Sequence, residues 1–128
     1  MKILVVDDDE ISRDLLEQLL LAVGHVDITK VNSAEYALCA IRETSHLFDC
    51  ILLDIQMPVT DGISLCRTIR QMPNYRETPI LMMTVMSDRD SIDRAFSNGA
   101  TDYVTKPFDV LELNARLVIA ARLSTDWK

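Results

Sequence analysis

Four carboxylic acids stand together directly after the first apolar segment of the chain, in the stretch KILVVDDDE. Asp7, Asp8, Asp9 and Glu10 follow the apolar run Ile3–Val6. Two like charges about 4 Å apart repel by roughly 4 kcal/mol at an effective dielectric of 20. The cluster therefore predicts a cation that offsets this repulsion. Oxygen ligands alone favour a hard ion such as Mg²⁺, which typically binds only one or two carboxylates and keeps several waters.

Other polar residues close later apolar segments. Asp54 ends the run CILL, Thr84 ends the run ILMM, and Lys106 follows the segment Thr101–Val104. A carboxylate surrounded by a metal ion, an ammonium group and a hydroxyl is suited to stabilising a phosphoryl group in transfer. The set contains no histidine or cysteine, so zinc is a poor candidate for this site.

The elements that must position these residues alternate between two hydrophobic periodicities. Continuous apolar or β-branched runs predict strands, and apolar residues spaced three or four apart predict a helix after each strand. The predicted strands are Ile3–Val6, Val26–Val31, Cys50–Leu53, Pro79–Met83 and Thr101–Val104.

Start and stop signals bound the predicted helices. Asn32 with Glu35 resembles a capping box for the second helix. Asp109 can cap the last helix, and Asp9 or Glu10 the first. The first helix carries the apolar repeat Ile11, Leu15, Leu19 and Val23, with Leu16 and Leu20 beside it, and ends at Gly24.

Five strand–helix units with fully apolar strands predict an α/β, doubly wound domain whose parallel sheet is covered by helices on both faces. In such sheets, ligands bind beyond the carboxyl ends of the strands. The periodicity does not give the order of the strands. It does predict that Asp7, Asp8, Asp54, Thr84 and Lys106 meet at one edge.

Composition excludes several classes of protein. The 128 residues carry a net charge of −7 and contain no Lys/Arg run, which argues against direct nucleic-acid binding by this chain. No apolar run approaches the roughly 18 residues of a membrane span, and the N-terminus is not a signal peptide. Cys39, Cys50 and Cys66 form no CxxC pair and are predicted to be buried, reduced thiols. These features predict a cytoplasmic protein.

The chain resembles a bacterial response-regulator receiver domain, of the type also found as the stand-alone chemotaxis regulator. The resemblance runs from Ile3 to about Leu123 and rests on ILVVDDD, CILLDIQMPVTDG, ILMMT and GATDYVTKPF, in this order. It implies a flavodoxin-like receiver fold with strand order 2-1-3-4-5 and five helices. The receiver domain would span residues 1–124, and residues 125–128 would be a tail or the start of a linker.

The resemblance also implies a role for each site residue. Asp54 would accept the phosphoryl group, and Thr84 and Lys106 would contact it. Tyr103 would act with Thr84 as the aromatic switch, and the Lys106–Pro107 bond matches a position that is commonly cis. The Mg²⁺ ion, with Mn²⁺ as a substitute, would be held by Asp7, Asp8, Asp54 and the main-chain carbonyl of Gln56.

By the same resemblance, a sensor histidine kinase or a phosphotransfer protein would supply the phosphoryl group, and the chain would not be an enzyme. The output face would comprise Asp88–Asn98, Thr101–Thr105 and Asp109–Arg116, and would control a downstream effector domain or protein. In one subgroup this face forms a homodimer in which residues matching Asp102 and Arg116 pair. Ile92 lies near the position where that pattern has a basic residue, so the sequence does not favour a dimer.

One position departs from the family pattern. The residue after Thr84 is usually small, whereas here it is Val85, which would narrow the approach to Asp54. Gln56 and Met86 should flank the path of the water that removes the phosphate, so the rate of phosphate loss should depend on both.

Two other classes compete with a receiver. A haloacid-dehalogenase-like phosphatase also begins with a strand followed by D-x-D, which Asp7 and Asp9 would supply, but it leaves Asp54 and Lys106 unexplained. Turnover on a generic phosphatase substrate would identify it. A pseudo-receiver would keep the fold as an interaction module without phosphorylation, and the complete set of acids, Thr84 and Lys106 argues against it.

Overall fold

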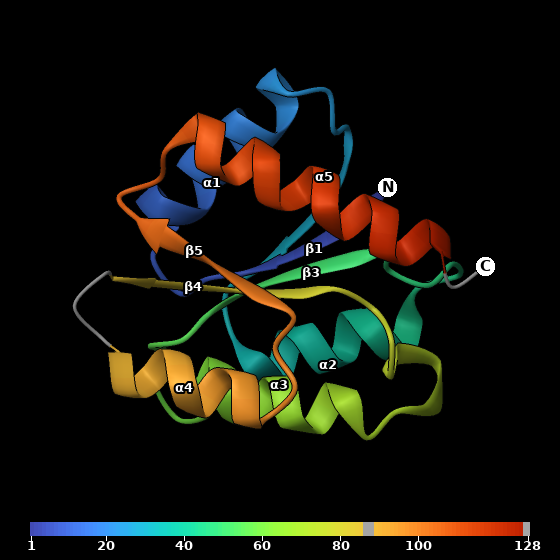
Figure 1. Ribbon diagram of the computed structural model, residues 1–128. Helices are drawn as coiled ribbons and strands as arrows, with labels where there is room; N and C mark the ends of the chain where they lie inside the picture. Colours follow the sequence, from blue (N-terminus) through green and yellow to red (C-terminus); the bar gives the residue numbers. More distant parts are fainter. Residues whose placement is uncertain (86–88, 127–128) are drawn as a thin grey trace.

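The computed structural model describes residues 1–85 and 89–126, with side chains up to Leu123. Within these residues five strands alternate with five α-helices (Figure 1). The strands are β1 (Lys2–Val6), β2 (Asp27–Val31), β3 (Cys50–Asp54), β4 (Ile80–Val85) and β5 (Asp102–Lys106). The helices are α1 (Glu10–Ala22), α2 (Ala34–Glu43), α3 (Gly62–Arg70), α4 (Arg89–Ser97) and α5 (Val110–Asp126), with a short 3-10 helix, η1, at Pro73–Tyr75.

The strands form one parallel sheet in the order β2-β1-β3-β4-β5, which confirms the predicted fold. Figure 1 shows α1 and α5 on one face of the sheet and α2, α3 and α4 on the other. Both faces of the central strands are therefore covered, which explains why their sequences are continuously apolar.

Two apolar cores lie on opposite sides of the sheet. Leu4 and Val6 of β1 belong to the core under α2, α3 and α4. Ile3 and Val5 point the other way, into the core with Leu16 and Leu20 of α1 and Leu113 and Leu117 of α5. All four β1 residues are completely buried. The rigid central strands hold the residues that follow them in fixed positions.

Three strands extend further toward their carboxyl ends than the apolar runs predict. β3 includes Asp54, β4 includes Thr84 and Val85, and β5 reaches Lys106. Asp54, Thr84 and Lys106 thus belong to the sheet itself, since the ladder continues through the pairs Asp54 with Met83, and Val85 with Lys106.

One detail of the predicted helices is wrong. The N-cap of α2 is Ser33 and not Asn32, because the Ser33 hydroxyl accepts the Tyr36 N–H at 3.1 Å. In α1 the buried residues are Leu16 and Leu20, whereas Ile11 is 80% exposed and Leu15 is 47% exposed. Asp9 caps α1 as predicted, accepting the Ile11 N–H at 3.1 Å.

The cysteines are free thiols. Cys50 and Cys66 are buried as predicted, and burial raises the pKa of Cys50 to about 12 and that of Cys66 to about 11. Cys39 is only half-buried.

Among the helices of residues 1–85 and 89–126, none has the length and apolarity that crossing a membrane requires.

Candidate functional site

The predicted site residues meet at the carboxyl edge of the sheet. Asp7 follows β1, Asp54 ends β3, Thr84 lies at the end of β4, and Lys106 ends β5. Asp7, Asp54 and Thr84 are buried polar residues, at 0%, 7% and 5% exposure. Buried polar groups need partners: Lys106 contacts both carboxylates, and the Thr84 hydroxyl donates to the Val85 carbonyl.

Three carboxylates form a potential metal site. One oxygen from each of Asp7, Asp8 and Asp54 lies within 4.8 Å of the other two, and Asp8 is exposed to solvent. This all-oxygen donor set is open on one side and fits a hard divalent cation that keeps several waters. Asp9 is occupied as the cap of α1.

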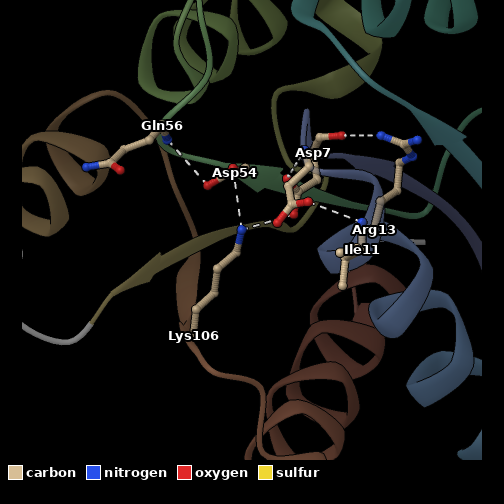
Figure 2. A network of polar contacts seen from close by, with 7 residues as sticks. Asp7, Ile11, Arg13, Asp54, Gln56 and Lys106 are labelled. Carbon is tan, nitrogen blue, oxygen red and sulfur yellow. Dashed lines mark hydrogen bonds and ion pairs between the residues drawn. The ribbon is translucent and has the colours of Figure 1, made fainter.

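Lys106 bridges two of these carboxylates, as Figure 2 shows. Its Nζ lies 3.0 Å from Asp7 Oδ2 and 3.4 Å from Asp54 Oδ2, and its side chain is 21% exposed. The same ammonium lies 5.9 Å from the centre of the Phe108 ring, within the range of a cation–π contact. The single ammonium group of Lys106 is therefore the shared counter-ion of the buried Asp7 and Asp54 carboxylates.

The two buried carboxyl groups differ in their affinity for a proton. For Asp54, burial is the largest cause of a pKa raised to about 7; the Asp7 charge raises it further, and Lys106 opposes both. For Asp7, burial also raises the pKa, but hydrogen bonds from the Asp9 N–H, Lys106 and Ser12 outweigh it, so the pKa is lowered. Of the two carboxyl groups, Asp7 is therefore the one that holds the negative charge more firmly when no metal ion is bound.

Neighbouring groups fix Asp7 in place. The Asp9 N–H donates to Asp7 Oδ1 at 3.0 Å, and Arg13 Nη1 donates to the Asp7 carbonyl at 2.8 Å (Figure 2). The sequence did not single out Arg13. Its only sequence signal is its position in the first turns of the helix that follows the acidic cluster.

Glu112 was also missed. Its carboxylate accepts the Thr105 N–H at 3.0 Å and the Thr105 hydroxyl at 3.0 Å, and so ties the end of β5 to the start of α5. Between these two anchors lies the Lys106–Pro107 bond, which is cis as the resemblance implied. No local pattern indicates this contact, because the partners are seven residues apart and belong to different elements.

The loop from Ile55 to Asp61 lies against Asp54. The Gln56 N–H donates to Asp54 Oδ1 at 3.3 Å, and the Gly62 N–H closes the loop onto the Ile55 carbonyl at 2.9 Å. A Cβ atom at Gly62 would overlap the Asp54 carbonyl oxygen, so only glycine allows α3 to begin so close to β3.

Thr84 and Tyr103, the two predicted switch residues, lie in β4 and β5. The Thr84 hydroxyl is at the strand end and donates to the Val85 carbonyl at 3.3 Å. The half-buried Tyr103 ring lies between Phe96 of α4, with ring centres 6.3 Å apart, and the Arg116 guanidinium of α5, 5.5 Å from the ring centre. Met86, predicted to flank the site, lies outside the described residues.

Asp102 and Arg116 form an ion pair within the chain, at 3.4 Å. The resemblance matched these two positions to residues that pair across a dimer in one subgroup. In this structure each already has the other as a partner.

Comparison with known proteins agrees with this geometry. Residues 3–118 match the family model of the response regulator receiver domain. The phosphate regulon transcriptional regulatory protein PhoB of Rhizobium meliloti is 41% identical over 118 residues, which are 91% of this chain and 50% of that protein. The two-component response regulator ARR18 of Arabidopsis thaliana is 36% identical over 113 residues, 88% of this chain and 17% of that protein. The chain thus spans half or less of the length of these curated relatives.

Solved structures with the same fold include chemotaxis protein CheY4 of Vibrio cholerae, at a TM-score of 0.84 and 28% identity over 93% of this chain and 97% of that one. The receiver domain of NtrX from Brucella abortus has a TM-score of 0.80 and 28% identity over 97% of this chain and 98% of that one. Both similarities extend over nearly the whole of each chain.

Proposed function

The chain belongs to the response regulator receiver domain family of two-component systems, and we propose that it is a switch activated by phosphorylation of Asp54. The observation that carries this proposal is the bridge that Lys106 makes between the Asp7 and Asp54 carboxylates beside the open acidic cluster. A buried carboxylate with an ammonium group and an oxygen-lined cation site beside it is equipped to accept and neutralise a phosphoryl group.

In this proposal the phosphoryl group comes from a phosphohistidine of a sensor kinase or phosphotransfer protein. The bond between phosphorus and the histidine nitrogen breaks as an Asp54 carboxylate oxygen bonds to phosphorus. Hydrolysis by water later releases inorganic phosphate and restores Asp54. The chain modifies itself and does not process substrates repeatedly.

Asp7, Asp8, Asp54 and the Gln56 main-chain carbonyl would hold Mg²⁺, or Mn²⁺ in its place. A bound divalent ion supplies charge stabilisation to the transferring phosphoryl group. Asp7 is suited to this role because its pKa is lowered, which keeps it ionised. Lys106 would move from the carboxylates to a phosphoryl oxygen, because phosphorylation converts Asp54 into a group carrying about −1.5 to −2 charges.

The response would pass through Thr84 and Tyr103 to the face formed by α4, β5 and α5. Tyr103 contacts both helices of this face through Phe96 and Arg116, which supports its place between the site and the surface. That face would control an effector domain or protein. Whether phosphorylation also drives this face to form a homodimer is tested by gel filtration with and without beryllofluoride, where identical elution volumes would rule out a phosphorylation-driven dimer.

Acetyl phosphate with Mg²⁺, followed by intact mass measurement, tests the proposal. We expect one added phosphate in the wild-type chain and none in Asp54→Asn. Labelling that persists in Asp54→Asn, or no labelling of the wild type, would refute the assignment. Chelation of the metal with EDTA should also stop the labelling, since the carboxylates would then lack their counter-ion.

A further inference from the structure

The loop beside the candidate site contains a strained three-residue turn. The Thr60 N–H donates to the Pro58 carbonyl at 2.9 Å, and Val59 between them has φ +70°. A turn in which the N–H of residue i+2 donates to the carbonyl of residue i, with a positive φ at the residue between them, is the rarer, strained form of the γ-turn. A β-branched residue in this backbone region is an outlier, because its side chain crowds the neighbouring carbonyl.

Packing of Val59 does not offset this strain. The residue is 107% exposed, so its side chain gains no burial within the described part of the chain. Glycine would adopt the same φ without steric cost.

Anchors on both sides impose the turn. Met57, on one side, is 9% exposed and packs in the core under α2, α3 and α4. On the other side the Asp61 carboxylate caps α3 by accepting the Ser64 N–H at 2.8 Å. The chain must cross between these anchors with only three residues, and fixed surroundings of this kind are what sustain backbone strain.

The same loop carries a group of the candidate site. Gln56 lies between buried Ile55 and buried Met57, and its N–H donates to Asp54 Oδ1. Figure 2 shows that Asp54 is contacted by both the Gln56 N–H and the Lys106 ammonium. A rearrangement of the turn that moves Met57 would therefore also move Gln56 and change the orientation of the Asp54 carboxylate.

We propose that strain at Val59 gives the loop a second, relaxed conformation, and that Val59 thereby lowers the affinity of the carboxylate site for Mg²⁺. This inference depends on the proposed function, because it is that proposal which assigns Gln56 and Asp54 as metal ligands. An ion that binds one conformation alone has its apparent affinity reduced by the fraction of molecules in that conformation. Val59 is thus a positioning residue that sets the apparent affinity of the carboxylate site for Mg²⁺.

Val59→Gly tests the proposal, with Val26→Gly as the matched control. Val26 is also exposed, at 80%, and precedes β2, away from the carboxylates. The measurements are the melting temperature in EDTA and the dissociation constant for Mg²⁺ by titration calorimetry. We expect Val59→Gly to raise the melting temperature by a few degrees and to lower the dissociation constant severalfold, up to about tenfold. Val26→Gly should lower the melting temperature slightly and leave the dissociation constant unchanged.

Val59→Asn separates relief of strain from added flexibility, because asparagine tolerates a positive φ but is less flexible than glycine. It should change both quantities in the same direction as glycine. If the melting temperature of Val59→Gly in EDTA does not rise, Val59 is not strained. If it rises while the dissociation constant for Mg²⁺ stays unchanged, the strain is not coupled to the metal site. Both outcomes leave Mg²⁺ binding and acetyl phosphate labelling of the wild type intact, so they differ from failure of the proposed function.

Discussion

The Lys106 ammonium lies 3.0 Å from Asp7, nearer than its 3.4 Å from Asp54. Asp7 is completely buried and has the lowered pKa of the two carboxyl groups. In the absence of a metal ion, Lys106 therefore acts chiefly as the counter-ion of Asp7. A divalent ion beside Asp7 would take over that role and make the lysine available to a phosphate on Asp54.

Lys106→Met should destabilise the metal-free chain, because it leaves Asp7 and Asp54 without their shared cation. Removing one partner of a buried pair costs about 3–5 kcal/mol, and we expect about 2–4 kcal/mol here because the lysine side chain is partly exposed. Urea denaturation in EDTA at neutral pH measures the loss. Added Mg²⁺ should restore part of it.

Lys30→Met is the control for that experiment. Lys30 pairs with Asp14 at 3.2 Å and Glu17 at 2.9 Å, on the surface between β2 and α1. Surface pairs contribute at most about 1 kcal/mol, and Mg²⁺ should not alter the effect. Equal losses in the two variants would contradict the role assigned to Lys106.

Asp54→Asn should change how stability depends on pH. The pKa of Asp54 is about 7 in the folded chain and near 3.8 when unfolded, so between these values the folded state binds more protons. Stability from this group therefore falls as the pH rises from about 4 to 7. Asp54→Asn lacks this penalty, and we expect it to be more stable than wild type at pH 7.5 in EDTA by as much as a few kcal/mol.

The difference between the two proteins should shrink as the pH falls toward 4, because Asp54 in the unfolded chain then approaches its own pKa of 3.8 and takes up protons as the folded chain already has. Asp7, with its lowered pKa, titrates below this window. His25, whose pKa is lowered chiefly by burial, is present in both proteins and cancels in the difference. Urea denaturation from pH 4.5 to 7.5 gives the two curves, and parallel curves would be inconsistent with a raised pKa at Asp54.

Gly62→Ala should disturb the site through the backbone. The added methyl group would overlap the Asp54 carbonyl, which must shift for α3 to begin at this point. We expect a loss of about 2–3 kcal/mol in the free energy of unfolding, and slower labelling by acetyl phosphate in the fraction that folds. Gly24→Ala is the comparison: Gly24 has φ +97° and no atom near its missing Cβ, so only the left-handed backbone contributes, about 1 kcal/mol.

The sequence predicted correctly that these polar residues meet at one edge, because the topology of a parallel sheet does most of the positioning. Once β1, β3, β4 and β5 run in the same direction, Asp7, Asp54, Thr84 and Lys106 lie at one edge whatever the details of packing. The same reasoning did not distinguish Ile11 and Leu15 from Leu16 and Leu20. Spacing defines an apolar stripe on α1, but the side of that stripe that is buried depends on where the sheet and α5 lie.

Contacts between distant segments could not be predicted from local patterns. Arg70 appears in the sequence only as a basic residue near the end of a helix. In the structure its Nε donates to the Gly99 carbonyl at 2.8 Å, Nη1 to the Tyr75 carbonyl at 2.7 Å, and Nη2 to the Thr101 hydroxyl at 3.1 Å. These partners come from two segments, η1 and the connection between α4 and β5, and burial lowers the pKa of the guanidinium.

Arg70→Met should therefore destabilise the chain far more than Arg67→Met, although both residues lie in the last turn of α3. Methionine keeps the apolar stem but leaves the Gly99 and Tyr75 carbonyls without a donor. Unsatisfied buried groups cost about 1–3 kcal/mol each, and we expect a total of about 2–4 kcal/mol because water reaches part of this site. Arg67 is exposed, so its replacement should cost less than about 0.5 kcal/mol. Urea denaturation of both variants decides the matter: similar midpoints would show that the Arg70 hydrogen bonds do not hold the end of α3 to the start of β5.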